Sequence, residues 1–293
     1  MDFKNYLVPG KTGLLIGIGG VSMSPLAEVL HDAGLDIRGS DMAESSNTLT
    51  LREHGIPIHI GHSADNVTDD ISFVIRTAAV HDDNPEVHEA HRRGIPVFER
   101  TQAWGALMRG YQNALCISGT HGKTTTTSMC THIMMAAEKD PTVMIGGTLP
   151  LLKACHRVGK GNTIIMESCE YYNSFLALNP TIAVVLNIEA DHLDFFKDLE
   201  DIKHSFRCFA ERVPAETGTV IANYDDANTM DALRGIAREV ITFGLNAKAD
   251  VYAQNIVHRG SVSEFDIYHR GNYFARVTLH VPGIHNVRNA LAA

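Results

Sequence analysis

The sequence predicts an α/β protein with two domains, each built around a mostly parallel sheet. The chain has 293 residues, and at about 100–200 residues per domain this length gives about two domains. Hydrophobic residues make up 44% of the chain and charged residues 20%, which provides apolar cores and excludes a disordered protein. From residue 13 onward, short apolar runs alternate with helical stretches, which is typical of strands connected by helices.

The first domain is predicted to be a doubly wound parallel sheet. Its strands correspond to the runs GLLIGIG, LDIRGSD, IPIHIG, ISFVIRT and IPVF. Helices are predicted between them at residues 24–33, 48–54 and 86–92. This series ends near residues 109–112, so we expect a first domain of residues 1–111 and a second of residues 112–293.

The second series begins with an apolar strand that runs through a glycine-rich loop into a helix, ALCISGTHGKTTTTSMCTHIMMAA. Further strands are predicted at NTIIMES, TIAVVLNI, GTVIAN and VITFG, with a helix at residues 199–212. After residue 250, the runs VYAQNIVHR, SEFDIYHR and YFARVTLHV predict an antiparallel meander at the edge of the sheet. The last residues, HNVRNALAA, resemble the first turns of a helix without a stop signal, so we expect the architecture to continue beyond them.

Charge and cysteine usage exclude several classes of protein. The 34 acidic and 25 basic residues give a net charge of −9, which argues against a broad nucleic-acid-binding surface but permits a local cationic pocket. The five cysteines are scattered without a CxxC pair, which argues against zinc or redox centres and favours a reducing compartment. No apolar run approaches the about 18–20 residues that span a bilayer, and the start lacks a signal peptide's apolar core. We therefore expect a soluble cytoplasmic protein that binds neither nucleic acid nor membrane.

The strongest motif is GTHGKTT at residues 119–125, after a strand and before a helix. Glycines let backbone N–H groups approach a triphosphate, Lys123 supplies a compact cation, and the Thr124 hydroxyl faces magnesium. The usual pattern G-x-x-x-x-G-K-[ST] needs a glycine where Ile117 stands, so this loop is a shorter variant. The alternative is a structural turn with an exposed lysine. The predicted ATP-binding residues of the loop are Gly119, Thr120, His121, Gly122, Lys123, Thr124 and Thr125.

A second glycine-rich turn, GIGGVSM at residues 17–23, follows the first strand. A full dinucleotide-binding fingerprint would place glycine at Ser22, whereas Asp41 ends the second strand where a ribose-binding acid would lie. The turn alone does not indicate a nicotinamide cofactor, and a purely structural role is the alternative. Because a separate phosphate loop follows in the chain, a phosphorylated substrate is favoured over NAD here.

Three further polar clusters follow predicted strands or open a helix. ESCE ends at Glu170 and DHLD spans residues 191–194, both at the sheet edge that also carries the phosphate loop. Carboxylate and imidazole groups there suit magnesium beside ATP, with helix capping or surface charge as the alternative. Glu167 is the preferred candidate among these acids. The third cluster, GIHNVRN at residues 283–289, has amide and imidazole groups that suit a base or ribose, although such residues more often cap helices.

The ordered set GTHGKTTTT, ESCEYYNSF, NIEADHLD and PGIHNVRNALAA resembles the Mur ligase family of ATP-dependent amide ligases. The GxGGxxM turn in a Rossmann-like first domain, with TAAV at residues 77–80 and DNPE at 83–86, resembles the members that join L-alanine to UDP-N-acetylmuramate. The resemblance covers essentially the whole chain. It implies a UDP-sugar-binding domain, a P-loop-type central ATP-binding domain and a third domain. We expect this chain to hold the first, to be incomplete at the C-terminal end of the second, and to lack the third. We therefore expect the chain alone to be inactive as a ligase but to retain UDP-sugar or nucleotide binding.

The resemblance also implies site residues. Lys123, Glu167 and His192 would be catalytic. Thr124, Glu167 and His192 would bind two Mg²⁺ ions, for which Mn²⁺ can substitute. Glu170 would face either the metal or the sugar. The residues near the nucleoside of ATP would be His285, Asn286 and Asn289. The UDP-sugar would be bound by Gly17, Gly19, Gly20, Val21, Ser22, Asp41 and Thr77. Two departures from the family pattern concern substrate detail: Ser22 replaces a glycine, and the run from Cys169 to Tyr171 replaces an Asp-Glu-Ser-type run.

The reaction implied by the resemblance is attack of the muramoyl carboxylate on the γ-phosphate of ATP. The resulting acyl phosphate is then attacked by the amine of L-alanine. This reaction would be a step of peptidoglycan synthesis in the bacterial cytoplasm, and it would thereby contribute to cell shape and cell division. The alternatives are a related ligase that adds a recycled murein peptide or another amino acid, a folylpolyglutamate synthase, and a non-catalytic nucleotide-binding fragment. The Rossmann-like first domain argues against the folate enzyme, whose chain would begin close to its ATP loop.

Overall fold

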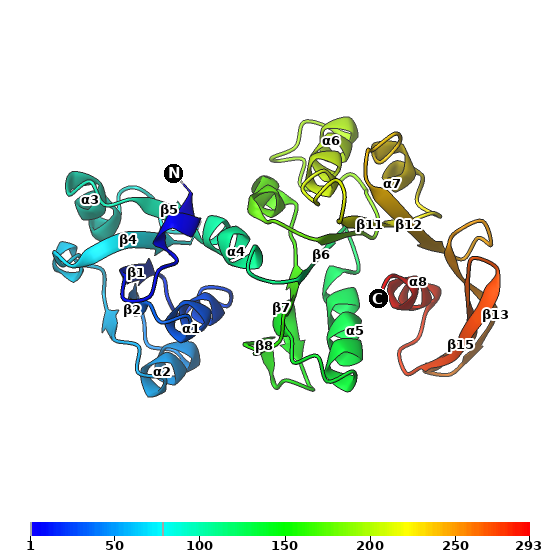
Figure 1. Cartoon of the computed structure of the whole chain (residues 1–293), viewed down its shortest axis with the longest axis horizontal. Helices are drawn as coiled ribbons and strands as arrows, with labels where there is room; N and C mark the ends of the chain where they lie inside the picture. The colour runs from blue at the N-terminus through cyan, green and yellow to red at the C-terminus, as the bar shows by residue number, and fades with distance from the viewer. Residues whose placement is uncertain (1, 78) are drawn as a thin grey trace. The chain divides into compact units, whose positions relative to one another are not determined.

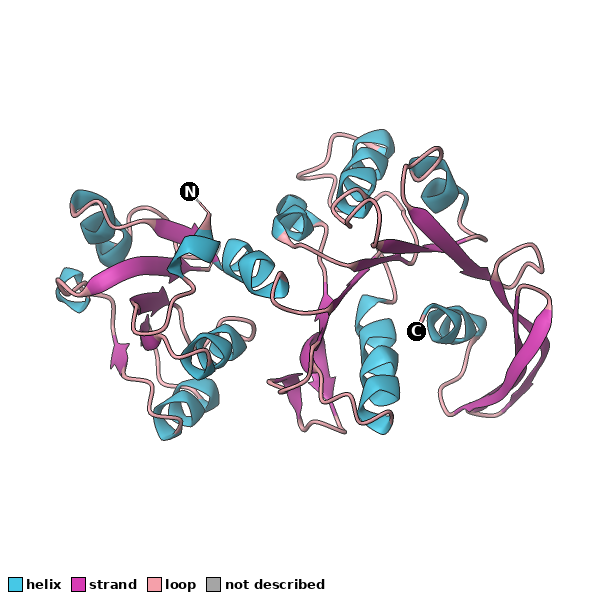
Figure 2. Cartoon of the chain, viewed as in Figure 1, coloured by secondary structure: helices cyan, strands magenta, loops and turns pink. Residues whose placement is uncertain are grey.

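The computed structural model describes residues 2–77 and 79–293 and divides into two compact units. The first comprises Met1–Gly110 and His156–Val158, and the second comprises Tyr111–Cys155 and Gly159–Ala293. Each unit contains one sheet with helices packed on it (Figures 1 and 2). The predicted mixed α/β fold is confirmed.

The first unit contains a five-stranded sheet in the order β3-β2-β1-β4-β5, and its paired neighbours are all parallel. The strands are β1 (Thr12–Ile16), β2 (Asp36–Asp41), β3 (Ile58–Ile60), β4 (Ile71–Arg76) and β5 (Val97–Glu99). The α-helices are α1 (Ser24–Asp32), α2 (Ser46–Glu53), α3 (Pro85–Arg92) and α4 (Arg100–Met108). Short 3₁₀ turns are η1 (Phe3–Tyr6) and η2 (Ala64–Asn66). This is the doubly wound sheet that the sequence predicted.

Capping residues explain where the observed helices differ from the predicted ones. Helix α2 begins at Ser46 rather than at residue 48, because Ser45 and Thr48 form a capping box in front of it. Helix α3 begins at Pro85, one residue earlier than predicted, because the Asn84 side chain accepts from the first free amides. Strand β1 is shorter than the predicted run, since the left-handed turn begins at Gly17 (φ 77°).

The second sheet has ten strands in the order β15-β14-β13-β12-β11-β10-β6-β9-β7-β8 and lies in the second unit except for the last two residues of β8. Its strands are β6 (Asn113–Ser118), β7 (Thr142–Leu149), β8 (Ala154–Arg157), β9 (Thr163–Glu167), β10 (Ile182–Val185), β11 (Thr219–Asn223), β12 (Glu239–Gly244), β13 (Val251–Arg259), β14 (Val262–His269) and β15 (Asn272–Leu279). Its helices are α5 (Lys123–Ala136), η3 (Tyr171–Ala177), α6 (Leu199–Ala210), α7 (Ala227–Ala232) and α8 (Ile284–Ala292). Strands β7 and β8 and helix α7 were not predicted.

Helices cover the sheet of the second unit in two layers. Helices α5 and α8 pack together on one face, while α6 and α7 pack on the opposite face (Figure 1). The antiparallel pairs β13–β14 and β14–β15 form the predicted meander at the sheet edge. The sheet there curves around α8 (Figure 2). Phe265 of β14 and Val287 of α8 share one buried core.

Each sheet has a point where the strand order reverses, and ligands of open α/β sheets bind beside such points. In the first unit the reversal lies between β1 and β4, whose carboxyl ends carry Gly17 and Thr77. In the second it lies between β6 and β10, whose carboxyl ends lead to Gly119 and Asn187. Within residues 2–77 and 79–293, no helix has the length and apolar character needed to cross a membrane.

Candidate functional site

The loop between β6 and α5 depends on its two glycines. Gly119 has φ 143° and Gly122 has φ 86°, and both values favour glycine over residues with a side chain. A Cβ on Gly119 would lie 2.9 Å from the Leu186 Cβ, and one on Gly122 would lie 2.7 Å from the Asn289 Oδ1. The loop therefore packs its backbone directly against β10's carboxyl end and α8.

Lys123, the first residue of α5, lies folded over this loop. Its Nζ donates to the carbonyl oxygens of Gly119 at 2.6 Å and Thr120 at 3.1 Å. It also forms an ion pair with Glu170, 3.0 Å from Oε2, and the Glu170 side chain is only 3% exposed. A buried carboxylate needs such a partner, so the Lys123–Glu170 pair links the phosphate loop to the segment after β9.

Thr124 and Glu167 form a second contact at the same helix turn. The Thr124 hydroxyl donates to Glu167 Oε1 at 3.0 Å, and the amide of Gly146 in β7 donates to Glu167 Oε2 at 2.7 Å. A Cβ on Gly146 would lie 2.6 Å from the Glu167 carboxylate. The sequence interpretation missed Gly146, although a glycine pair inside the apolar run VMIGGT is a signal for a close backbone approach.

These oxygen donors are compatible with magnesium. Within residues 2–77 and 79–293, no three His, Cys, Asp or Glu side chains form a group that could hold a metal ion. Nucleotide-bound Mg²⁺ needs fewer protein ligands, because it is usually held by one or two carboxylates while phosphates and water complete its octahedral shell. The Thr124 hydroxyl and the Glu167 carboxylate therefore have the chemistry that such an ion requires.

His192 lies in the loop after β10, near Lys123's partner. Its Nε2 is 3.9 Å from Glu170 Oε1. The ring of Tyr171 stacks on its imidazole, and the Tyr171 hydroxyl donates to Asp194. This hydrogen bond raises the pKa of the Tyr171 phenol above its usual value. The structure thus groups the three predicted catalytic residues around the first turn of α5. Lys123 lies in that turn, Glu167 contacts the neighbouring Thr124, and His192 lies near Glu170, the partner of Lys123.

Asn187 braces the phosphate loop and was missed by the sequence interpretation. Its Oδ1 accepts from the His121 amide at 2.7 Å, and its Nδ2 donates to the His121 carbonyl at 3.0 Å. The Thr120 hydroxyl accepts from the Glu189 amide at 2.9 Å, and Thr125 continues α5 in a half-buried position. A polar residue immediately after the apolar strand TIAVVL was the available signal for Asn187.

A cavity of about 330 Å³ opens beside the phosphate loop. It is lined by His121, Leu186, Asn187, Glu189, Asn223, Asp225, Asp226, Phe243, His285, Arg288 and Asn289. Two of the three predicted nucleoside-binding residues, His285 and Asn289, therefore border it. The third, Asn286, donates from Nδ2 to the Pro282 carbonyl at 2.7 Å and so braces the start of its own helix.

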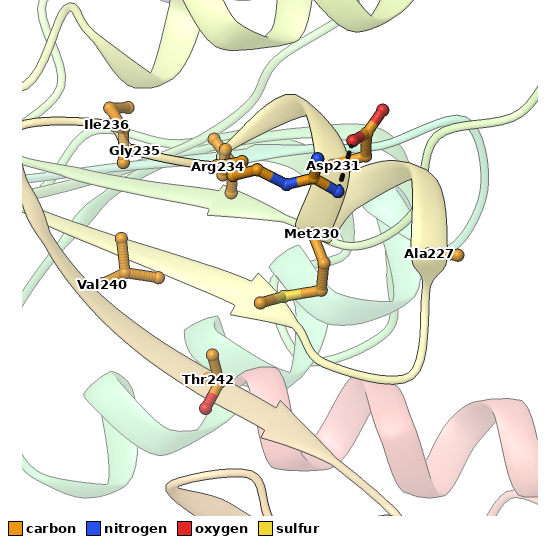
Figure 3. Close-up of a pocket in the computed structure, with 9 residues that line it drawn as sticks. Ala227, Met230, Asp231, Arg234, Gly235, Ile236, Val240 and Thr242 are labelled. Carbon is orange, nitrogen blue, oxygen red and sulfur yellow. Dashed lines mark ion pairs between the residues drawn. The ribbon is translucent and has the colours of Figure 1, made fainter.

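A larger hollow of about 670 Å³ lies between α7 and β12 (Figure 3). Its lining includes Met230, Ile236 and Val240, together with Arg234, which pairs with Asp231 at 2.8 Å (Figure 3). The residues nominated by the sequence lie elsewhere. Its size alone does not make it a phosphate site, because the Arg234 guanidinium is already paired with a carboxylate.

The first-unit turn at residues 17–22 is braced by side chains from β2 and α2. Asp41 Oδ2 accepts from the Gly19 amide at 2.8 Å, so this predicted ribose-binding carboxylate also supports the turn. A Cβ on Gly19 would lie 2.9 Å from Thr48 Cγ2, whereas Val21 is 56% exposed. The predicted Gly20 donates its amide to Gly17 O at 3.1 Å.

Ser22 and Thr77 border the same turn. The Ser22 carbonyl accepts from Trp104 Nε1 at 3.1 Å, and Thr77 Cγ2 would lie 3.4 Å from a Cβ on Gly17. Of the segment at residues 77–80 that carried part of the resemblance, Ala78 lies outside the described residues.

The DNPE segment supplies a buried carboxylate, Glu86, to the first unit. Its side chain is fully buried, and Ser40 Oγ donates to Oε2 at 2.7 Å. His62 Nδ1 lies 2.8 Å from the same oxygen, and Asn66 Nδ2 donates to Oε1 at 2.6 Å. This network joins the end of β2, the loop after β3 and helix α3 beside the glycine turn.

Comparison with known proteins identifies both units. The family description "Mur ligase middle domain" matches residues 117–293, and "Mur ligase family, catalytic domain" matches residues 15–112. A curated relative from Agathobacter rectalis, named UDP-N-acetylmuramate--L-alanine ligase, is 46% identical over 279 residues, or 95% of this chain and 61% of the relative. A relative of the same name from Clostridium novyi is 45% identical over all 293 residues and 63% of its own length.

Solved structures show the same relationship. The UDP-N-acetylmuramate-alanine ligase of Thermotoga maritima superposes with a TM-score of 0.78 at 31% identity, covering 96% of this chain and 63% of that one. A ligase from Neisseria meningitides, named for UDP-N-acetylmuramate and the peptide L-alanyl-γ-D-glutamyl-meso-diaminopimelate, gives 0.83 at 25% identity, with 97% and 91% covered. The chain spans 61% and 63% of the two curated relatives' lengths. From its matched family descriptions and the phosphate loop, the chain belongs to the Mur ligase family.

Proposed function

We propose that this chain carries the UDP-sugar-binding domain (residues 1–111) and the ATP-binding domain (residues 112–293) of a peptidoglycan-precursor ligase. The enzyme joins L-alanine to the carboxylate of UDP-N-acetylmuramate. The observation that carries this proposal is the grouping of Lys123, Thr124, Glu167 and Glu170 at the first turn of α5. The curated relatives with that activity in their name, 46% and 45% identical, support the choice of substrates.

ATP binds in this proposal with its phosphates on residues 119–125. The loop amides and the N-terminus of the 14-residue helix α5 provide partial positive charge toward the phosphates. Lys123 exchanges Glu170 and the loop carbonyls for phosphate oxygens. The nucleoside occupies the cavity that His285 and Asn289 border.

Thr124 and Glu167 would hold the Mg²⁺ ion, and His192 a second one. When bound, the ions supply positive charge that offsets the repulsion between a carboxylate and a triphosphate. Gly146 fixes the Glu167 carboxylate through its amide, so the side chain is oriented before nucleotide arrives.

The reaction begins with the carboxylate oxygen of UDP-N-acetylmuramate attacking the γ-phosphorus of ATP. The bond from that phosphorus to the β,γ-bridging oxygen breaks, ADP leaves with the oxygen, and the sugar retains an acyl phosphate. The amine of L-alanine then attacks the acyl carbon, loses a proton and expels phosphate, which leaves the amide. Lys123 stabilises the charge that moves onto the departing phosphate oxygens, a role of positioning and electrostatics.

A ligase that adds a whole murein peptide is the alternative. The Neisseria meningitides structure favours it by its TM-score of 0.83, against 0.78 for the Thermotoga maritima alanine ligase. Sequence identity favours alanine, at 31% against 25%. We give identity more weight, because proteins of one fold share backbone geometry across different substrates.

The test is calorimetric binding of Mg-ATP and of UDP-N-acetylmuramate to this chain, followed by ADP release with both present. ADP release is measured with L-alanine and with the L-alanyl-γ-D-glutamyl-meso-diaminopimelate peptide. We expect both ligands to bind and Lys123→Ala to weaken ATP binding only. The matched control is Lys139→Ala, just beyond the other end of α5, which should leave both affinities unchanged. ATP binding that is unaffected by Lys123→Ala would contradict the proposal.

A further inference from the structure

An aromatic cluster surrounds His192, and no motif explains it. The cluster consists of Tyr171, Tyr172 and Phe195. Tyr171 and Tyr172 lie in or beside the run where this sequence departs from the family pattern. Ring centroids lie 4.3 Å apart between Tyr171 and Tyr172, and 4.9 Å apart between Tyr172 and Phe195. The cluster extends from the surface, where Tyr172 is 66% exposed, to the imidazole of His192.

Tyr171 contacts the His192 loop at two points. Its ring lies 4.4 Å from the imidazole, centroid to centroid, with an interplanar angle of 25°. Its hydroxyl donates to the carboxylate of Asp194, two residues after His192. This hydrogen bond also ties Tyr171 to the loop that carries the imidazole, while the stacked ring itself contacts the imidazole.

The carboxylates beside the imidazole of His192 do not accept hydrogen bonds from it. Nε2 lies 3.9 Å from Glu170 Oε1 and Nδ1 lies 4.0 Å from Asp191 Oδ1. Both distances exceed those of hydrogen bonds, which seldom exceed about 3.2 Å between nitrogen and oxygen. Stacking on Tyr171, rather than hydrogen bonding to these carboxylates, therefore sets the ring's orientation.

The backbone around His192 is held in a conformation that costs free energy. His192 has φ 52°, and Tyr172 has φ 53°, in the left-handed region that costs non-glycine residues about 1–3 kcal/mol each. The His192 carbonyl accepts from the amides of Phe195 and Phe196, both at 2.9 Å. Strain of this kind persists when surrounding contacts fix it, and it is common at functional sites.

We propose that Tyr171 is a positioning residue that holds the His192 imidazole beside the Lys123–Glu170 pair, ready to bind a divalent cation. The proposal rests on the proposed function, which assigns a cation to His192. Groups that contact a metal-binding histidine orient its ring and affect metal affinity by about 10- to 100-fold. In most such sites the partner accepts a hydrogen bond from the ring, whereas here an aromatic face replaces it.

The first experiment measures the stacking itself. In the chain labelled at its histidine rings, NMR should show the Cε1 proton of His192 shifted upfield by the ring current of Tyr171. The signal is assigned by its disappearance in His192→Gln. Tyr171→Ala should remove the upfield shift and Tyr171→Phe should keep it. A His192 signal that is the same in Tyr171→Ala would overturn the proposal.

The second experiment titrates Mn²⁺ into the chain with a nonhydrolysable ATP analogue and follows free Mn²⁺ by electron paramagnetic resonance. Tyr171→Ala should weaken the His192-dependent affinity by about 10-fold, and Tyr171→Phe should restore it. Combining Tyr171→Ala with His192→Gln should cost no more than His192→Gln alone. Tyr273→Ala, an equally drastic change at a position 60% exposed on β15, is the matched control.

The outcomes separate the two proposals. If the unsubstituted chain binds no Mn²⁺–nucleotide, the proposed function fails, and this inference fails with it. If the complex forms but Tyr171→Ala binds Mn²⁺ as tightly as the unsubstituted chain, only the role of Tyr171 is overturned. Equal losses in Tyr171→Ala and Tyr171→Phe would also overturn it, because the ring would then not be the element that matters.

Discussion

The two glycine turns of this chain share a backbone design but differ in the side chains around them. Each turn follows a buried parallel strand at the point where strand order reverses, and each leads into a helix. At residues 17–22 the brace is acidic, since the Gly19 amide donates to Asp41. At residues 119–125 the turn carries Lys123, with Thr124 and Glu167 beside it.

Under the proposed function, this difference corresponds to a difference in ligand. A backbone turn with a helix behind it accommodates a phosphate group through N–H donors and the helix dipole. A triphosphate also requires a cation and a metal, and the second turn has a lysine and a paired hydroxyl and carboxylate within hydrogen-bond reach. Under the proposed function, the side chains, rather than the strand–turn–helix geometry, would therefore distinguish a nucleoside diphosphate site from an ATP site.

The largest expected effect is that of Lys123→Ala on ATP. Loss of a charge-assisted contact worth about 1.5–3 kcal/mol should weaken Mg-ATP binding by about 10- to 100-fold. Titration calorimetry on this chain measures both ligands. UDP-N-acetylmuramate affinity should not change, because the proposed UDP-sugar site at residues 17–22 does not include Lys123. Equal losses for both ligands would remove the distinction between the turns.

The next effect concerns the buried Glu86 network beside the first glycine turn. Glu86→Ala leaves Ser40, His62 and Asn66 without the buried carboxylate they share. We expect the free energy of unfolding of the first unit to fall by about 2 kcal/mol. The single tryptophan of the chain, the buried Trp104 of α4, reports this unfolding by its fluorescence in urea.

Glu53→Ala, an exposed position on α2, serves as the control for Glu86→Ala and should leave the urea midpoint unchanged. A Glu86→Ala midpoint equal to that of Glu53→Ala would show that the buried network contributes nothing to the first unit.

Gly122→Ala sharpens the description of the phosphate loop. The new Cβ combines a left-handed φ of 86° with a 2.7 Å approach to Asn289, so we expect a loss of about 2 kcal/mol. Gly271→Ala is the matched control, because Gly271 has φ 81° and a Cβ there would have no described atom within 4 Å. It should cost about 1 kcal/mol. Calorimetric melting compares the two, and equal losses would show that contact with Asn289 is unimportant.

Local patterns predicted the parts of this site that lie within one strand and one turn. The strand–turn–helix at residues 113–136 was identifiable because its glycines, Lys123 and Thr124 are contiguous and follow an apolar strand. The sequence also placed Glu167, Glu170 and His192 at the sheet edge that carries this loop. It did not reveal the individual pairings, since Glu170 lies 47 positions from Lys123 and Asn187 lies 66 positions from His121. Such pairings depend on strand order, which a single sequence does not reveal.

Strand β7 was missed for a related reason. It contains Gly146 and Gly147, and glycine is unfavourable inside strands, so the run did not resemble one. The structure shows that Gly146 leaves the room in which Glu167 lies. The motif at residues 283–289 contains both of the roles that the sequence left open. Asn286 braces the start of its own helix, whereas His285 and Asn289 line the cavity.

The smallest expected effect is a pH dependence in the first unit. Arg92 and then Arg93 lower the pKa of Glu89 from its ordinary 4.5 to about 2. A lowered carboxyl pKa stabilises the fold above the unfolded value, and this stabilisation is lost as pH falls from about 4.5 toward 2. Glu89→Gln should therefore lower the urea midpoint at neutral pH. The difference in midpoint between this variant and the unsubstituted chain should shrink as the pH falls below about 4.5. A difference in midpoint that stays constant to low pH would contradict the role of the lowered Glu89 pKa.

The most direct test of the central claim is a crystal structure of this chain with a nonhydrolysable ATP analogue and Mn²⁺. The account predicts the triphosphate on residues 119–125, the ammonium of Lys123 turned from Glu170 to phosphate, and Mn²⁺ bound by Thr124 and Glu167. Triphosphate found at residues 17–22, or in the hollow between α7 and β12, with the Lys123–Glu170 pair intact, would contradict it.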